Sequence, residues 1–164
     1  MRISDYLTRD RIALDLDARP KTAVLGGLVS MLAASLGLPD REPLLAEVLR
    51  RESIMSTGIG DGIAIPHAAV DGIAGPAIAI GVAPGGIDYE SVDAKPVHVI
   101  FLLVGNRDAP GLQLKALARI ARLTREPGFI TSLTAARTPE AALALIAAED
   151  ARAEEVPPPP ELKR

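Results

Sequence analysis

Residues 56–67, STGIGDGIAIPH, bring together the side chains of this protein that are best suited to do chemistry. The stretch contains three glycines and a proline, and it ends at His67, one of only two histidines in the chain. A neutral imidazole nitrogen is a nucleophile near neutral pH and can receive a phosphoryl group. Because Pro66 fixes its own φ and keeps the preceding residue extended, we expect the imidazole of His67 to be held by a constrained backbone.

The three glycines, Gly58, Gly60 and Gly62, do not form a nucleotide-binding loop. Their spacing differs from the dinucleotide fingerprint, and no Gly-Lys-Ser/Thr ending follows them. Glycine permits a positive φ and lets backbone N–H groups approach an anion closely. The residues alone leave two interpretations open: a loop that presents a nucleophile, or a loop that makes tight turns around a merely structural His67.

Other candidate residues carry weaker signals. His98 lies within the apolar run VHVIFLLV, where a histidine is more often a core or sheet-edge residue than a ligand, and Ser56, Thr57 and Asp61 are most simply loop residues. The absence of cysteine excludes disulfides, thiolate metal sites and cysteine nucleophiles. No HExxH-like spacing is present, so a metal-dependent hydrolase is disfavoured, and we expect neither a metal nor a cofactor.

Composition narrows the classes of partner. The 164 residues suit one domain, and 48% of them are hydrophobic, which is enough for a sizeable core. Aromatic residues make up 2% and the formal net charge is -3, so neither base stacking nor a basic surface favours nucleic acid. The apolar segment 23–38 is shorter than the roughly 20 residues that span a bilayer. We expect a cytoplasmic protein with no membrane insertion.

The pattern along the chain predicts the elements that must position His67. We expect an extended segment over residues 12–16, helices over residues 20–37 and 40–52, and a buried strand over residues 76–83. The run 97–105 is apolar on both faces, as in a central strand. Helices follow over residues 112–126 and after Thr138, with Pro139 in the first helical position.

This mixture predicts an α/β fold: a single-domain sandwich in which a small central mixed β-sheet is flanked by helices. Residues 1–150 form the expected domain. Residues 151–164, ARAEEVPPPPELKR, combine charges with four prolines, and we expect a disordered tail there.

Residues 51–67, RESIMSTGIGDGIAIPH, resemble the active-site signature of the EIIA proteins of the bacterial phosphotransferase system, of the fructose, mannitol and nitrogen-regulatory type. The resemblance continues through KPVHVIFLLV and LKALARIARLTREPGF and covers about residues 1–150. It implies an α/β sandwich with a mixed sheet and a phosphocarrier function. His67 would accept a phosphoryl group from phosphorylated HPr and pass it to a cysteine of an EIIB domain. In nitrogen-regulatory members the phosphorylation state would instead act on a regulated target protein.

The resemblance also assigns roles to other residues. Arg51 matches the family arginine near the active histidine, and its guanidinium can pair two phosphoryl oxygens; this position favours Arg51 over Arg50. The amides around Gly58, Gly60 and Gly62 would add hydrogen-bond donors to the phosphoryl group.

Gln113 marks a departure, because relatives commonly carry a second histidine there. Its amide can donate a hydrogen bond to a phosphoryl oxygen but cannot become cationic. This departure leaves an alternative open, a regulatory binding module that has kept the EIIA fold and lost efficient phosphotransfer. The lack of a fused transporter or EIIB domain in this sequence favours a regulatory member over a sugar-transport member.

Overall fold

The computed structural model describes residues 1–155, which form five α-helices and six strands. The helices are α1 (Lys21–Ser35), α2 (Glu42–Ile54), α3 (Pro110–Leu123), α4 (Phe129–Ala135) and α5 (Pro139–Glu155). The strands are β1 (Ile12–Ala13), β2 (Gly58–Gly60), β3 (Ile63–Ala64), β4 (His67–Val70), β5 (Ala77–Ile87) and β6 (Val97–Asn106). Two short 3-10 helices, η1 (Ile3–Tyr6) and η2 (Arg9–Arg11), precede β1.

The strands form one mixed sheet in the order β1-β5-β6-β3-β2, with β4 also paired to β6. The long strands β5 and β6 are antiparallel, whereas β3 and β4 both run parallel to β6, one after the other along its length. Both faces of β6 are buried, as its unbroken apolar sequence predicts. The central strand thus sets the position of β4, whose first residue is His67.

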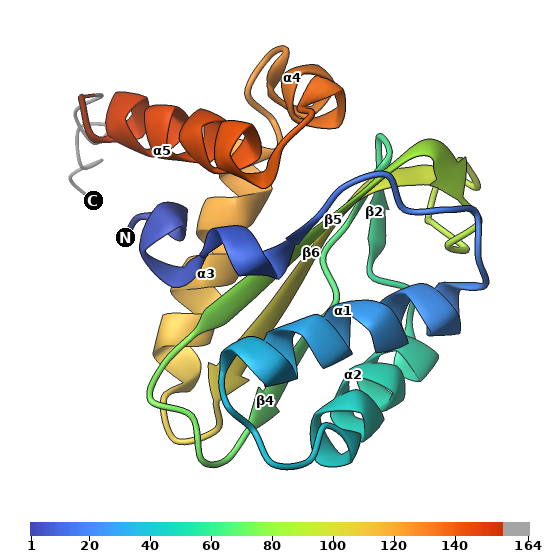
Figure 1. The fold of residues 1–164 in the computed structure, drawn as a ribbon, viewed down its shortest axis with the longest axis vertical. Helices are drawn as coiled ribbons and strands as arrows, with labels where there is room; N and C mark the ends of the chain where they lie inside the picture. The colour runs from blue at the N-terminus through green and yellow to red at the C-terminus, as the bar shows by residue number, and fades with distance from the viewer. Residues whose placement is uncertain (156–164) are drawn as a thin grey trace, which may run out of the picture.

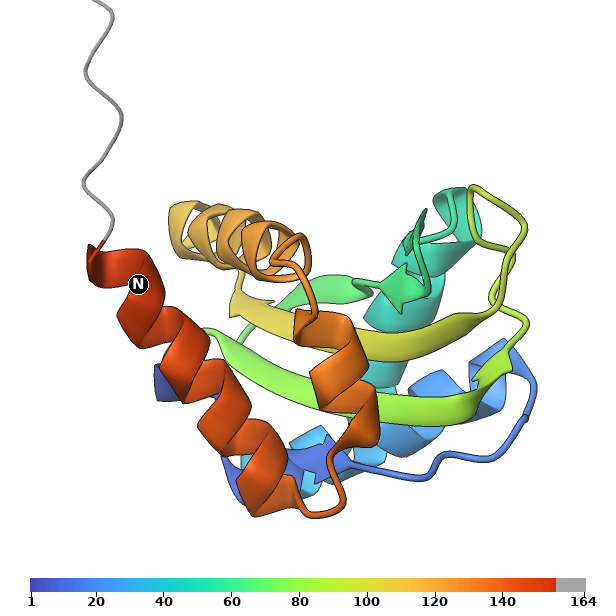
Figure 2. The same ribbon diagram turned by 90° about the horizontal axis from the view of Figure 1, so that it is seen from above.

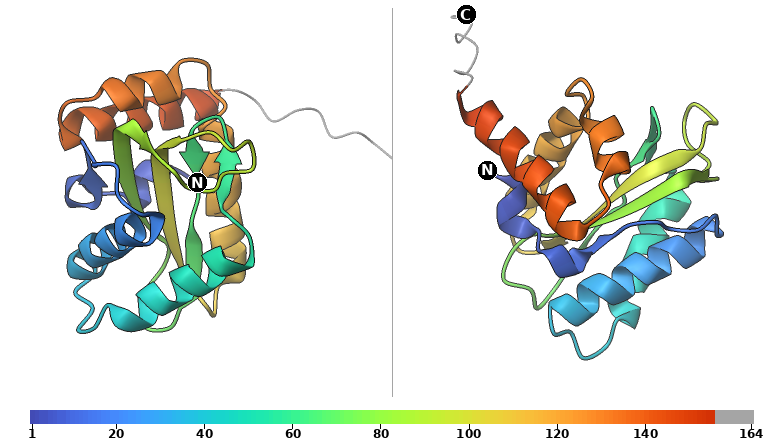
Figure 3. Two further views of the ribbon diagram at one scale, coloured as in Figure 1. Left: turned by 90° about the vertical axis from the view of Figure 1, so that its right-hand side faces the viewer. Right: turned by 45° about the horizontal axis from the view of Figure 1, so that its top comes forward.

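Helices cover both faces of the sheet, giving three layers (Figure 1 and Figure 2). One core cluster joins α1 and α2 to one face, and a second joins the N-terminal segment, α3, α4 and α5 to the other. The left view of Figure 3 shows α1 and α3 on opposite sides of the sheet. Successive residues of β6 alternate between the clusters: Phe101 and Leu103 face the α3 side, and Leu102 faces α1. The predicted α/β sandwich with a mixed sheet is confirmed.

Several helix boundaries follow the sequence signals closely. α1 begins directly after Pro20 and ends at Ser35. Gly37, two residues later, has a φ of 67°, the left-handed conformation that commonly follows the end of a helix. α5 begins at Pro139, and the hydroxyl of Thr138 accepts a hydrogen bond from the Ala141 amide at 3.1 Å. These caps satisfy backbone groups that a helix end leaves free.

Other boundaries differ from the predictions. Only Ile12 and Ala13 of the expected segment 12–16 form the strand β1, because the chain turns at Asp15, which has a φ of 55°. Beyond this turn the Leu16 amide still donates a hydrogen bond to the Val82 carbonyl of β5 at 2.9 Å. α4 was not predicted as a separate element. α5 continues to Glu155, so residues 151–155 are helical rather than part of a disordered tail; residues 156–164 lie outside the described part of the chain.

A buried ion pair holds the N-terminal segment against the last helix. Asp150 is 1% exposed and accepts hydrogen bonds from the Ser4 amide at 2.9 Å and from the Arg119 guanidinium at 3.0 Å. Since Arg119 belongs to α3 and Asp150 to α5, the pair joins three segments on the α3 side of the sheet. None of the helices in the described residues is both long and apolar enough to cross a membrane.

The loop formed by residues 88–96, between β5 and β6, packs closely against β2. The Val92 amide donates to the Gly58 carbonyl at 3.1 Å, and the Ser91 hydroxyl accepts from the Gly60 amide at 3.2 Å. A Cβ added to Gly58 would lie 2.7 Å from Ser91 Oγ and 2.9 Å from Ser91 Cα. Only glycine therefore allows this approach of the two backbones without a shift.

We predict that Gly58→Ala destabilises the protein by about 1–3 kcal/mol, because the added methyl group must push the 88–96 loop away from β2. Urea unfolding followed by circular dichroism measures the change. Gly27→Ala is the matched control: Gly27 lies within α1 and has open space around its Cβ position. That variant should be neutral or up to about 1 kcal/mol more stable. Equal stability of the two variants would contradict the packing described for Gly58.

Candidate functional site

His67 is the first residue of β4 and lies opposite Leu103 of β6, on the side of the sheet that faces α3. Its side chain is half-buried. The Nδ1 atom lies 2.9 Å from the carbonyl oxygen of Ile65, two residues earlier. A carbonyl oxygen can only accept a hydrogen bond, so Nδ1 carries the proton. In the neutral ring Nε2 is then the unprotonated, nucleophilic nitrogen.

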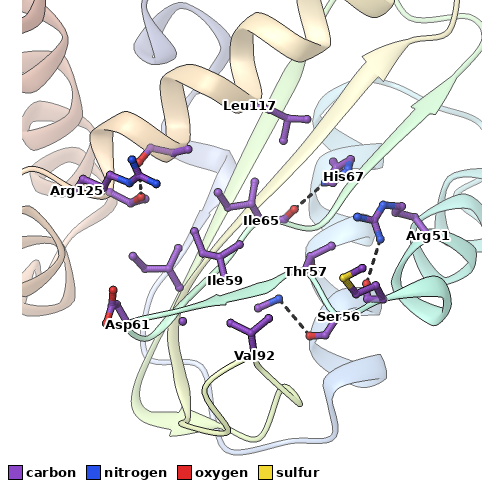
Figure 4. A pocket seen from close by; sticks show the side chains of 16 residues that line it. Arg51, Ser56, Thr57, Ile59, Asp61, Ile65, His67, Val92, Leu117 and Arg125 are labelled. Atoms are coloured by element: carbon purple, nitrogen blue, oxygen red, sulfur yellow. Dashed lines mark hydrogen bonds between the residues drawn. The ribbon is translucent and has the colours of Figure 1, made fainter.

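The imidazole borders a cavity of about 760 Å³ between α2, the β2–β3 hairpin and α3 (Figure 4). Its lining combines the ends of these elements with the 88–96 loop: Arg51, Met55, Ser56, Thr57, Gly58, Ile59, Gly60, Asp61, Ile63, Ile65, His67, Val92, Leu117, Ala121, Thr124 and Arg125. In Figure 4, Arg51 and His67 lie toward one end of the cavity and Asp61 and Arg125 toward the other. A nucleophile and two cations therefore share one cavity.

Arg51 lies in the last turn of α2, and its Nη1 donates to the Met55 carbonyl at 3.0 Å. That contact uses one of five N–H donors, so the guanidinium keeps others for an anion. Arg50 instead pairs with Glu47 at 3.2 Å, and it does not line the cavity. Of these two arginines, Arg51 is the one that borders the cavity.

The glycine amides are arranged differently from the expectation. Gly58 N donates to Ser56 Oγ at 3.2 Å and Gly60 N donates to Ser91 Oγ, so neither amide is available for a phosphoryl oxygen. Gly62 is the second residue of the two-residue hairpin turn and has a φ of 79°, and its carbonyl accepts hydrogen bonds from the amides of His98 and Val99. These glycines shape the hairpin that walls the cavity, and the expected nest of free donors is corrected for Gly58 and Gly60.

Gln113 lies in the first half of α3, over β4 and β6. Its Nε2 atom donates to the Ala68 carbonyl at 3.4 Å, directly after His67, and its Oε1 atom lies near Gly105. The side chain is half-buried and does not line the cavity described above. The structure thus places Gln113 beside the backbone that carries His67.

His98 lies away from the cavity, on β6. Its Nδ1 atom is 3.1 Å from the Ala83 carbonyl, and its ring packs beneath Gly62. It borders a separate open groove between the β2–β3 hairpin and α4. Among residues 1–155, no group of three or more histidine, aspartate or glutamate side chains could hold a metal ion.

A buried carboxylate behind the cavity was missed from the sequence. Glu52 is 7% exposed and accepts hydrogen bonds from Lys21 Nζ at 2.8 Å, from the Thr57 amide at 2.9 Å and from the Thr57 hydroxyl at 2.5 Å. Tyr89, fully buried, contacts the same hydroxyl at 3.1 Å. A signal existed: Glu52 continues the apolar positions Leu44 and Val48 at a spacing of four, which puts it on the inward face of α2.

The surroundings of Glu52 set its ionisation. Burial alone would raise the pKa of this carboxyl, but the hydrogen bonds from Lys21 and Thr57 and the charge of Lys21 outweigh burial, so the pKa lies below its ordinary value. Burial likewise raises the pKa of Tyr89. Glu52 is therefore a carboxylate at neutral pH, and Tyr89 is a neutral hydrogen-bond donor.

Three comparisons place this geometry among known proteins. A family model described as "Phosphoenolpyruvate-dependent sugar phosphotransferase system, EIIA 2" matches residues 5–149. The chain is 36% identical over 150 residues to the fructose-specific EIIABC component of Bacillus subtilis. The aligned region covers 92% of this chain but only 24% of that longer protein. It is 33% identical over 153 residues to the nitrogen regulatory protein of Bradyrhizobium diazoefficiens, covering 93% and 99% of the two chains.

A solved structure shares the fold. The crystal structure of nitrogen regulatory protein IIA-Ntr from Neisseria meningitidis superimposes with a TM-score of 0.81 at 26% sequence identity. The match covers 88% of this chain and 98% of that one. The three-layer arrangement around β6 is thus the arrangement of that protein.

The lowered pKa of Glu52 predicts a loss of stability in acid. Between the folded-state pKa and the unfolded value of about 4.3, the unfolded chain binds more protons, so the free energy of unfolding falls as pH falls. The double variant Lys21→Met/Glu52→Gln lacks this titration, and neutral replacement of a buried pair is often tolerated. Urea unfolding from pH 7 to pH 3 should show a shallower acid decline for the double variant. Parallel curves would contradict the lowered pKa.

Proposed function

The chain belongs to the type 2 EIIA family of the phosphoenolpyruvate-dependent sugar phosphotransferase system, and on this premise we propose that it carries a phosphoryl group on His67. The single observation that carries the proposal is the hydrogen bond from His67 Nδ1 to the Ile65 carbonyl. It leaves Nε2 unprotonated at the border of a cavity that also contains Arg51. The donor would be a phosphorylated HPr-like carrier protein.

The transfer needs no proton to move. The lone pair of His67 Nε2 attacks the phosphorus of the donor's phosphohistidine, and the Nε2–P bond forms as the donor's N–P bond breaks. The electron pair of the broken bond stays on the donor's ring nitrogen. His67 keeps its Nδ1 proton throughout, because the Ile65 carbonyl continues to accept it. Catalysis then reduces to positioning and to stabilising the charge of the phosphoryl oxygens.

Arg51 is the side chain best placed to stabilise that charge. A guanidinium can pair two phosphoryl oxygens in a planar, bidentate geometry. Arg125, which lines the same cavity from the region following α3, adds a second positive charge and favours the approach of an anion. Gln113 offers only a neutral amide, already directed to the Ala68 carbonyl, so its contribution is a hydrogen bond at most.

Large exposed apolar side chains surround the site and supply a docking surface for the donor. Ile54, Met55 and Val92 are 69%, 65% and 70% exposed, and Ile59 is 48% exposed. Exposed apolar patches of this kind mark sites of association between proteins. Asp61, at the tip of the β2–β3 hairpin, is exposed at the edge of the same surface and would face a basic group of the donor.

The phosphoryl group has two destinations consistent with the relatives. In the fructose-specific protein of Bacillus subtilis the EIIA region is part of an EIIABC component, which supports transfer to the cysteine of an EIIB domain. The nitrogen regulatory relatives support a role in which the phosphorylation state acts on a target protein. The same docking surface would serve the donor and the recipient.

Reconstitution tests the proposal as a whole. The protein is incubated with phosphoenolpyruvate, Enzyme I and HPr, and its intact mass is measured. We expect the gain of one phosphoryl group that is lost in acid and retained in base, as for a phosphohistidine. No gain would favour the alternative of a binding module that has lost phosphotransfer, and subsequent addition of an EIIB domain distinguishes relay from regulation.

His67→Ala should abolish this mass gain, whereas His98→Ala should retain it. The two variants are matched because both histidines are half-buried and both place Nδ1 against a backbone carbonyl. Only His67 borders the cavity. Phosphorylation that persists in His67→Ala and disappears in His98→Ala would show that His98 is the carrier, and it would contradict the proposal.

Arg51→Ala should slow phosphorylation by about a hundredfold, because the transition state loses a charged donor. Arg50→Ala is the control, since Arg50 belongs to the same turn of α2 and pairs with Glu47 outside the cavity. Quenched-flow measurements with excess phosphorylated HPr give both rates. If the two variants retain the same rate as the wild type, Arg51 is a surface residue without a role in transfer.

A further inference from the structure

Within residues 1–155 two ion pairs are buried, and only one of them is connected to His67. Lys21–Glu52 joins α1 to α2, with side-chain exposures of 16% and 5%. Arg119–Asp150 joins α3 to α5, with side-chain exposures of 13% and 1%. The pairs are similar in burial, but the hydrogen bonds of Glu52 continue toward the site.

The connection from Glu52 to His67 runs through the backbone groups of Thr57 and Ile65. Glu52 holds both the amide and the hydroxyl of Thr57. The Thr57 carbonyl accepts a hydrogen bond from the Ile65 amide at 3.0 Å. The Ile65 carbonyl, in turn, accepts the hydrogen bond from His67 Nδ1 at 2.9 Å. Three successive contacts therefore lead from the carboxylate to the ring of His67.

Each donor and acceptor near Glu52 in this series of hydrogen bonds has a fixed role. A carboxylate only accepts, so the Thr57 hydroxyl donates its proton to Glu52, and the Tyr89 hydroxyl must be the donor to Thr57 Oγ1. Lys21 Nζ, besides its bond to Glu52, lies 4.6 Å from the centre of the Tyr89 ring. The carboxylate is thus surrounded by groups that hold it in one orientation.

We propose that Glu52 is a positioning residue for phosphoryl transfer: by anchoring Thr57 it fixes the Ile65 carbonyl that selects the Nδ1-protonated form of His67. This proposal rests on the proposed function of His67 and adds a residue to it. Glu52 does not line the cavity, so it acts on the reaction through Thr57 and Ile65 rather than by touching the phosphoryl group.

Loss of the anchor has a specific consequence. Without Glu52, Thr57 lacks the acceptor for its amide and hydroxyl, and the segment between α2 and β2 can shift. The Ile65 carbonyl then no longer holds Nδ1, and the ring populates both neutral forms. A misplacement of about 1 Å at a reacting group can cost as much as a hundredfold in rate.

The first measurement determines which ring nitrogen of His67 is protonated in the unphosphorylated protein. Long-range 1H–15N NMR gives this at a pH at which the ring is neutral. We expect one form with a protonated Nδ1 in the wild type and a mixture of both forms in Glu52→Ala. Asp150→Asn, which breaks the matched ion pair, should leave the wild-type signature intact although it also lowers stability. A wild-type signature in Glu52→Ala, or an equal change in Asp150→Asn, would overturn the proposal.

The second measurement is the rate of phosphorylation with saturating phosphorylated HPr. Glu52→Ala should reduce this rate by about tenfold or more, with a smaller effect on the donor concentration at half-saturation. Lys21→Met/Glu52→Gln keeps an amide oxygen for the Thr57 amide and should recover most of the rate. A double variant as slow as Glu52→Ala would contradict anchoring through Thr57.

Thr57→Val and Thr57→Ser keep the proposal testable if Glu52→Ala does not fold. Valine removes the hydroxyl that Glu52 binds, whereas serine retains it, so the valine variant should be slower and the serine variant close to wild type. Equal rates for the two would count against the proposal. If the wild type is not phosphorylated at all, the proposed function fails, but the NMR measurement still tests whether Glu52 controls the protonation of His67.

Discussion

The hydrogen bond between His67 Nδ1 and the Ile65 carbonyl determines which nitrogen of the ring can react, and much of the structure serves to hold its two ends. Pro66 lies between the two residues and limits the backbone that joins them. β4, paired in parallel with β6, fixes His67, and the contact with Thr57 fixes Ile65. A side chain of ordinary chemistry thereby becomes a nucleophile with one defined reactive atom.

The wall of the cavity depends on a second constraint, the close packing of β2 against the 88–96 loop. The Ser91 hydroxyl accepts a hydrogen bond from the Gly60 amide. The half-buried Asp93 carboxylate accepts hydrogen bonds from the amides of Lys95 and Asp61, which lowers the pKa of Asp93. These contacts leave no room for a side chain at Gly58. The hairpin is consequently a preformed surface, which suits the proposed docking of a carrier protein in one orientation.

The sequence predicted the sandwich and the central strand, because apolar runs and helix caps are local signals, and the Pro-His step singled out His67 as a candidate. It did not reveal which groups accept hydrogen bonds from the amides of Gly60 and Asp61, since these acceptors lie 31 and 32 residues further along the chain. Glu52 was recognisable as a charge on an apolar stripe, but its partner Lys21 belongs to another helix. Long-range polar contacts of this kind follow from tertiary packing and have no local pattern.

In the proposed transfer, Nε2 of His67 carries the phosphoryl group while Nδ1 keeps its proton. NMR of the phosphorylated protein, with 15N-labelled histidine and 31P detection, tests it directly through the coupling between phosphorus and the ring nitrogen. The structure predicts coupling to Nε2 of His67 and a proton on Nδ1. Coupling to Nδ1 of His67, or to either nitrogen of His98, would contradict the account.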